Sequence, residues 1–149
     1  MLNAFFGVVV AVVQDHDGWV NKFEGDAALC VFGAPLAIDD AEGAALAAGR
    51  ELRDRLIAEL PDLPAGIGIS AGPIVAGNVG AEERFEYTVI GDAVNEAARL
   101  TELAKQRRGR LLASEAVLAG ARGGEAARWR LEGPVELRGR PVPTCIAVA

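Results

Sequence analysis

The sequence predicts a single α/β domain in which helices cover one face of a β-sheet. Its length of 149 residues fits one domain. Hydrophobic residues make up 51% of the chain, enough to build a sizeable core. Helical and extended patterns alternate along the chain, and no linker or internal repeat divides it. We therefore expect one folded unit over residues 1–149.

Two long segments predict helices. Apolar residues recur at spacings of three and four from Leu2 to Val13, which is the period of an amphipathic helix and not of a strand. Asp39 and Asp40 are good N-caps for a second helix, which we expect to extend to about Leu60, where prolines follow.

A tight β-hairpin is predicted between these two helices. Apolar runs flank Glu24-Gly25, which we expect to be the two residues of the turn. In that register Phe23 lies opposite Asp26 and shares its face of the hairpin. Because successive side chains of a strand alternate in direction, Lys22 then points to the other face.

The rest of the chain predicts shorter elements that complete the sheet. A third helix opens at Gly91, with Asp92 as its predicted N-cap. In chain order we expect strands over 65–71, 74–77 and 85–90, a helix from 91 to about 107, a strand over 110–113, a short helix after Ser114, and closing strands near 129–135 and over 145–148.

Charge and cysteine content exclude several classes of function. The formal net charge of −6 argues against a nucleic-acid-binding protein, which needs a basic face to displace counterions from phosphates. The two cysteines lie in apolar runs, as core residues do in a reducing compartment. The apolar segment from Ala4 to Val13 is shorter than the roughly 20 residues of a membrane span. We expect a cytoplasmic protein with no membrane contact from this segment.

Three places in the sequence carry polar residues that could bind a ligand or take part in catalysis. Lys22 and Asp26 lie near the hairpin turn, where a solvated turn with ordinary surface charges is the alternative interpretation. Asn95 and Arg99 are four residues apart and project from one helical face, where an amide suits a hydroxyl or ring oxygen and a guanidinium suits a phosphate. A polar helix face is the alternative there. The segment Arg138-Gly139-Arg140 is interpreted, by itself, as a turn with two exposed arginines.

Three stretches resemble, in this order, the catalytic domain of class III nucleotidyl cyclases, particularly bacterial adenylate cyclases of the mycobacterial kind. They are WVNKFEGD over 19–26, GISAGPIVAG over 68–77 followed by Gly80, and YTVIGDAVNEAARL over 87–100. Three motifs at family-like intervals are more specific than any one of them, and the similarity covers nearly the whole chain. The resemblance implies a ferredoxin-like, palm-type sheet with helices on one face.

The resemblance also implies a reaction and a role for each candidate residue. The reaction is conversion of ATP to 3′,5′-cyclic AMP and pyrophosphate with two divalent ions, Mg²⁺ or Mn²⁺. By position, Asp26 resembles the second metal-binding aspartate of the family, Lys22 the lysine that reads adenine, and Asn95 the asparagine that orients the ribose. Arg99 resembles the arginine that stabilises the pentavalent phosphate, and Arg138 a basic residue that contacts the phosphates.

In this family the sites lie between two catalytic domains arranged head to tail. One domain supplies the metal ligands, and the other supplies the residues for base, ribose and transition state. The opposite facing predicted for Lys22 and Asp26 fits that division. The resemblance therefore implies a head-to-tail homodimer with two equivalent sites, or a heterodimer with another cyclase domain.

The sequence departs from the family pattern in two places. The family domain begins with a strand that carries the first metal-binding aspartate, and only 25 residues precede Asp26 here. We expect an N-terminally incomplete domain that lacks this strand and is a weak catalyst. Thr88 stands where many adenylate cyclases have an aspartate, and its oxygen can accept the same hydrogen bond from adenine. The alternative function is a non-catalytic cyclase-homology module that dimerises with and regulates a complete cyclase; a guanylate cyclase is disfavoured by Lys22.

Overall fold

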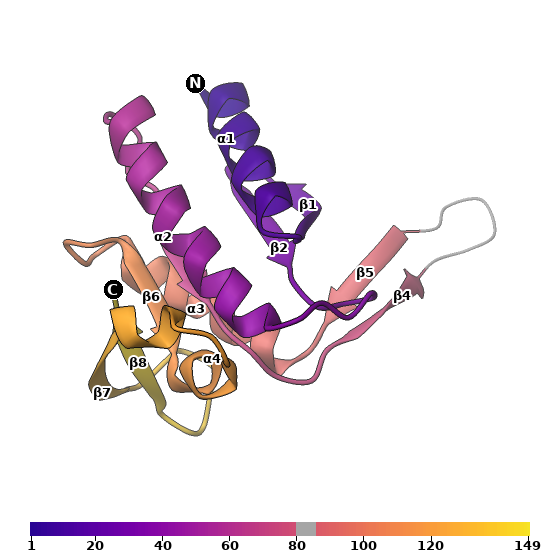
Figure 1. Cartoon of the computed structure of the whole chain (residues 1–149), viewed down its shortest axis with the longest axis vertical. Coiled ribbons are helices and arrows are strands. Elements are labelled where there is room, and N and C mark those ends of the chain that lie inside the picture. The colour runs from indigo at the N-terminus through magenta and orange to yellow at the C-terminus, as the bar shows by residue number, and fades with distance from the viewer. Residues whose placement is uncertain (80–85) are drawn as a thin grey trace.

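A computed structural model of the chain describes residues 1–79 and 86–149 (Figure 1). Helices and strands follow the predicted order. They are α1 (Leu2–Asp15), β1 (Trp19–Glu24), β2 (Ala27–Val31), α2 (Ala41–Glu59), β3 (Ile67–Ile69), β4 (Val75–Val79), β5 (Glu86–Ile90), α3 (Asp92–Ala104), β6 (Leu111–Ser114), α4 (Glu115–Gly120), a 3₁₀ turn (Glu125–Arg128), β7 (Arg130–Val135) and β8 (Thr144–Val148). The predicted start of a strand at Phe85 and the loop at Gly80 lie outside the described residues.

The mixed α and β architecture is confirmed, with a finer division of the strands than predicted. Ladder hydrogen bonds in the described residues define three sheets: β1-β2, β3-β6-β8-β7 and β4-β5. In the four-stranded sheet β3 runs parallel to β6, and the other pairs are antiparallel. The β4-β5 ribbon extends away from the rest of the chain (Figure 1).

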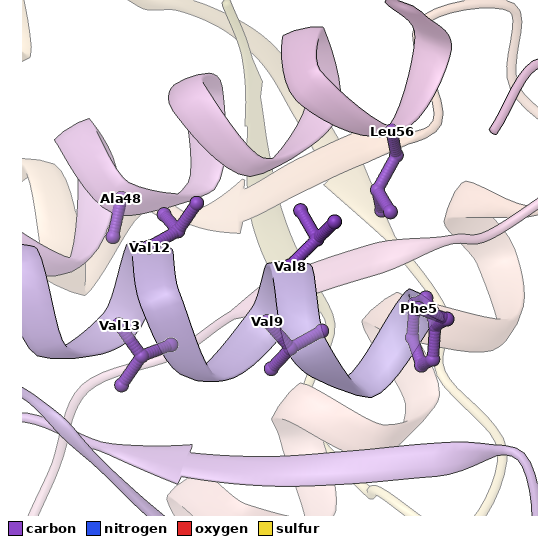
Figure 2. Close-up of a cluster of buried hydrophobic side chains, with 7 residues drawn as sticks. All are labelled: Phe5, Val8, Val9, Val12, Val13, Ala48 and Leu56. Atoms are coloured by element: carbon purple, nitrogen blue, oxygen red, sulfur yellow. The ribbon is translucent and has the colours of Figure 1, made fainter. Parts of the chain in front are cut away.

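The first core cluster joins the two long helices to the hairpin. Five apolar residues of α1 are buried and pack against Ala48 and Leu56 of α2; they are Phe5, Val8, Val9, Val12 and Val13 (Figure 2). Partly buried residues of β2 and Ile67 of β3 pack on the same cluster. The hairpin and the four-stranded sheet are thus held together by side-chain packing under α1 and α2.

Helices cover both faces of the four-stranded sheet, so the prediction that they cover a single face is wrong. Leu111 and Ala113 of β6 pack with Leu46 of α2 and Val117 of α4. Leu112, between them, packs with Leu100 of α3 in a separate cluster. Because side chains of a strand alternate between faces, α3 lies opposite α2 and α4. A strand that is buried on both faces has no exposed polar face, and all four residues of β6 are buried, three of them apolar.

The backbone of α3 lies directly on β3. A Cβ atom added to Gly68 would stand 2.5 Å from the carbonyl oxygen of Ala97 and 2.5 Å from the amide nitrogen of Thr101. Only a residue without a side chain permits that approach. Gly68 thereby fixes the distance between the sheet and α3.

We expect the substitution Gly68→Ala to push α3 away from the sheet. The clash is with backbone atoms, which cannot rotate aside, so the free energy of unfolding should fall by about 1–3 kcal/mol. Gly109→Ala is the matched control, because nothing lies within 4 Å of an added Cβ there. Urea denaturation of both variants measures the difference; equal stabilities would contradict the close packing of α3.

Burial raises the pKa of the Cys30 thiol in β2 to about 11. At pH 8 only about one thiol in a thousand is then ionised, so alkylation of Cys30 in the folded chain should be slow and should accelerate up to about pH 11. Because the unfolded thiol loses its proton first, this residue should make stability fall as pH rises above about 9. Peptide-resolved iodoacetamide labelling with and without urea measures the rate; equal rates in the two states would contradict the burial.

No helix in the described part of the chain combines the length and the apolar character needed to cross a bilayer.

Candidate active site

The hairpin turn differs by one residue from the prediction. Glu24 pairs with Ala27 and Phe23 with Ala28, so Gly25 and Asp26 are the two turn residues. The expectation that Phe23 lies opposite Asp26 is therefore wrong. Gly25 has a φ of 60°, and a hairpin turn with a glycine in the left-handed region at its first position suits the twist of the strands. Asp26 consequently lies exposed at the tip of the hairpin, on neither strand face.

Lys22 lies on the face of β1 that is turned away from α1. Its neighbour Phe23 packs on Phe6 of α1, with ring centroids 4.2 Å apart. The Nζ of Lys22 forms an ion pair of 2.9 Å with Oε1 of Glu24, two residues along the same strand face. The prediction that Lys22 and Phe23 face opposite ways is confirmed, and Glu24 helps to hold the lysine near the hairpin tip.

Thr88 lies in the β4-β5 ribbon, where it pairs with Gly77. Its side chain is partly buried. β5 approaches β1, the strand of Lys22. The two residues assigned to adenine by resemblance therefore come from neighbouring strands of the same chain.

Asn95 and Arg99 lie on the exposed face of α3, one helical turn apart. The opposite face of the helix is anchored by its buried residues Glu96, Leu100 and Ala104. Neither Asn95 nor Arg99 has a side-chain hydrogen bond or ion pair within residues 1–79 and 86–149. The predicted shared face is confirmed, and both side chains are available to a ligand.

The start of α3 contains a polar cluster that the sequence analysis missed. The N-cap is Gly91 and not Asp92, whose carboxylate instead forms an ion pair with Arg140 at 2.7 Å. Arg140 also pairs with Glu96. Its side chain is 17% exposed, so the expectation of two exposed arginines in this segment holds for Arg138 and is wrong for Arg140. The spacing of four between Asp92 and Glu96, which places both on one helical face, was the available signal.

Among the described residues no group of three or more His, Cys, Asp and Glu side chains gathers as a metal centre would. Asp26 is a single exposed carboxylate. One carboxylate suits Mg²⁺ or Mn²⁺ that arrives with a triphosphate, since these ions keep several waters and take phosphate oxygens as ligands. The donor set therefore fits a metal bound together with a nucleotide, and not a closed protein site.

The β1-β2 hairpin and α3, which carry most of the predicted residues, are not in extensive contact with each other. In Figure 1 the β1-β2 hairpin lies beside α1, whereas α3 lies behind α2. The elements in contact with α3 are chiefly β3 and β6, and those in contact with the hairpin include α1. Lys22 and Asp26 thus come from the hairpin, and Asn95 and Arg99 come from a helix that has no extensive contact with it.

The family model for the adenylate and guanylate cyclase catalytic domain matches residues 1–148. The chain belongs to this family. An uncharacterized protein of Mycobacterium bovis is 58% identical over 147 residues, which is 99% of this chain and 26% of that protein. An uncharacterized protein of Mycobacterium tuberculosis is 59% identical over 143 residues, or 96% of this chain and 25% of that protein. The cyclase chain thus spans about a quarter of the length of these relatives.

Solved cyclase structures share the fold. A bacterial light-regulated adenylyl cyclase superposes with a TM-score of 0.81 at 22% identity, over 99% of this chain and 43% of that one. The adenylyl cyclase CyaB from P. aeruginosa superposes with a TM-score of 0.80 at 24% identity, over 98% of this chain and 78% of that one. The guanylyl cyclase Cya2 superposes with a TM-score of 0.70 at 29% identity, over 98% of this chain and 76% of that one. Cyclases with either substrate therefore resemble this chain, which is a class III nucleotidyl cyclase domain.

Proposed function

We propose that this cyclase domain converts ATP to 3′,5′-cyclic AMP and pyrophosphate. In the reaction the ribose 3′-oxygen loses its proton and bonds to the α-phosphorus, and the bond from that phosphorus to the pyrophosphate oxygen breaks. The observation that carries the proposal is the exposed pair Asn95 and Arg99, one turn apart on α3 with no partner among the described residues. A cation and an amide at this spacing can contact a phosphate and a ribose at once.

Each side chain has a role that its chemistry supports. Arg99 neutralises charge that develops on the α-phosphate oxygens in the transition state, and Asn95 orients the ribose by hydrogen bonds. Arg138, exposed after β7, lies near the position of a basic family residue that contacts the phosphates, and its guanidinium suits that contact. Asp26 would hold Mg²⁺ or Mn²⁺. A metal ion bound there with ATP supplies neutralisation of the phosphates and a more acidic 3′-hydroxyl.

Lys22 and Thr88 favour ATP over GTP as the substrate. The hydroxyl oxygen of Thr88 can accept a hydrogen bond from the adenine amino group, and the ammonium of Lys22 can donate to a ring nitrogen. A guanine presents a carbonyl oxygen where adenine presents the amino group. ATP is abundant in the cytoplasm, and we place the reaction there.

Two copies arranged head to tail would complete the site. The family pattern divides the metal ligands from the other site residues, so Asp26 of one copy would serve the nucleotide held by Lys22, Asn95 and Arg99 of the other. A twofold arrangement gives two equivalent sites. A heterodimer with another cyclase domain would complete one such site.

The second candidate is a non-catalytic module that dimerises with a complete cyclase and regulates it. It is favoured by the hairpin having one carboxylate, Asp26, to offer a metal, since its other carboxylate, Glu24, is paired with Lys22. The two candidates differ in what Arg99 does. If the chain stimulates a complete cyclase equally well as wild type and as Arg99→Ala, it acts as a module.

The first experiment is formation of cyclic nucleotide by the purified chain, with Mg²⁺ and then with Mn²⁺. We expect cyclic AMP from ATP, less cyclic GMP from GTP, and a loss of at least about tenfold in the variant Asp26→Ala. No cyclic nucleotide above a protein-free blank under any condition would rule out catalysis by this chain, and equal activity in Asp26→Ala would rule out the role of Asp26.

A further inference from the structure

A polar cluster joins the end of the chain to the start of α3. Arg140, in the loop between β7 and β8, donates from Nε to Oδ1 of Asp92 at 3.3 Å and from Nη2 to Oδ2 at 2.7 Å. Its Nη1 donates to a carboxylate oxygen of Glu96 and to Oγ1 of Thr144, the latter at 2.5 Å. Thr144 in turn donates to Glu96 at 2.8 Å, and Ser70 donates to the other oxygen of Glu96. Segments next to β3, β7 and β8 therefore converge on one helix.

The Glu96 side of this cluster is enclosed, whereas the side chain of Asp92 is 73% exposed at the surface. Glu96 is 8% exposed and Thr144 5%, and both oxygens of the Glu96 carboxylate accept hydrogen bonds. The two-point contact of Arg140 with Asp92 fixes the plane of the guanidinium. Hydrogen-bonded ion pairs with little solvent access hold their geometry better than exposed ones.

The first half of α3 depends on these contacts for its placement. The buried apolar residues of the helix, Leu100 and Ala104, lie in its second half, and Glu96 is the buried residue nearest its start. The N-cap Gly91 has no side chain that could cap the helix. Arg140 therefore supplies an anchor at the end of the helix that has no fully buried apolar residue.

The anchored face is next to the face that carries the candidate catalytic pair. Asn95 follows Asp92 by three residues, and Arg99 follows Glu96 by three, so each lies about 60° around the helix axis from an anchored carboxylate. Rotation of the first turn would redirect Asn95 first and Arg99 with it. A misplacement of about 1 Å in a reacting group can cost about 100-fold in rate.

We propose that Arg140 is a positioning residue of the cyclase reaction, which fixes the rotation of α3 through Asp92 and Glu96 and so directs Asn95 and Arg99 at the nucleotide. This inference rests on the proposed function. It assigns Arg140 an indirect role, because its guanidinium is engaged by two carboxylates of its own chain.

The test compares kcat and KM for ATP in Arg140→Ala, Arg140→Lys and the control Arg130→Ala. Arg130 is an exposed arginine of β7, with a side chain that is 75% exposed. We expect Arg140→Ala to lower kcat by about 10- to 100-fold with KM changed less than about threefold. Arg140→Lys, which keeps the charge but not the fork, should recover part of kcat. Arg130→Ala should stay within about twofold of wild type.

Hydrogen exchange supplies a readout that does not depend on turnover. The amides of Val94 and Asn95 donate to the carbonyl of Gly91 at 3.1 and 3.4 Å and report on the first turn of α3. Arg140→Ala should raise their exchange rates while amides of β6 keep theirs. Should Arg140→Ala not fold, Asp92→Asn removes one carboxylate charge at an exposed position and tests the same contact.

The outcomes separate the inference from the function on which it rests. A kcat loss in Arg140→Ala with faster exchange confined to the start of α3 supports positioning. Two results would overturn the inference while the wild type remains active and the proposed function stands. One is a kcat of Arg140→Ala equal to that of Arg130→Ala. The other is amide exchange in Arg140→Ala that is raised throughout the core. A wild type no faster than Arg99→Ala overturns both.

Discussion

Replacing Arg99 by alanine is expected to lower the rate of cyclic AMP formation by about 100- to 1,000-fold, the usual cost of removing one group that stabilises transition-state charge. The side chain is exposed on α3 and has no partner among the described residues, so its removal should leave the fold unchanged. The loss should fall mainly on kcat, because the charge on the α-phosphate oxygens grows on the way to the transition state. Steady-state rates with Mn²⁺ and ATP measure it.

The control for this variant is Arg108→Ala. Arg108 is an exposed arginine shortly after α3, and its removal changes the net charge equally. It should retain activity within about twofold. If Arg99→Ala loses no more activity than Arg108→Ala, α3 does not contribute to catalysis and the proposed function loses its main support.

The largest expected effect on stability is that of Leu100→Ala. Leu100 is fully buried and packs with Leu112, Leu137 and Ile146 beneath α3. Removal of its isobutyl group leaves a cavity and should lower the free energy of unfolding by about 2–5 kcal/mol. Urea denaturation measures the change from the shift in midpoint at constant slope.

The matched control here is Leu36→Ala. Leu36 is 80% exposed, so the same atoms are removed without a cavity, and the change should stay below about 0.5 kcal/mol. A similar loss in the two variants would mean that α3 is not packed on the sheet as described. Leu100 follows Arg99 in sequence, so α3 carries core residues and candidate site residues at adjacent positions.

Local signals were enough to predict the long helices. The apolar repeat in 2–13 and the carboxylate of Asp40 are features of one segment each, and Asp40 does accept a hydrogen bond from the amide of Gly43 at 3.2 Å. The shared face of Asn95 and Arg99 also follows from spacing alone. These predictions needed no knowledge of the rest of the fold.

The hairpin register and the placement of α3 could not be predicted from local patterns. The pairing of Glu24 with Ala27 depends on which residue of Glu24-Gly25-Asp26 adopts the left-handed conformation, and the apolar runs fit either turn. The four residues of β6 are too few for periodicity to show that both faces are covered.

The Arg140 cluster is a tertiary feature. Arg140 and Glu96 are 44 residues apart in sequence, so their contact exists only once β8 has paired with β6 and α3 has packed on the sheet. From the sequence alone each of these charged side chains is predicted to be exposed to solvent, since most arginines and glutamates are exposed. The resemblance to cyclases points to the functional residues themselves, but not to the residues that place them.

The central claim is that the hairpin of one copy and α3 of another form one site, and the most direct test mixes two inactive variants. Asp26→Ala and Arg99→Ala should each be nearly inactive alone. In an equimolar mixture about half of the dimers contain one copy of each variant. Each of these mixed dimers has one intact site out of two, so the mixture should regain about a quarter of the wild-type rate. A mixture no more active than the sum of its components would contradict the shared site.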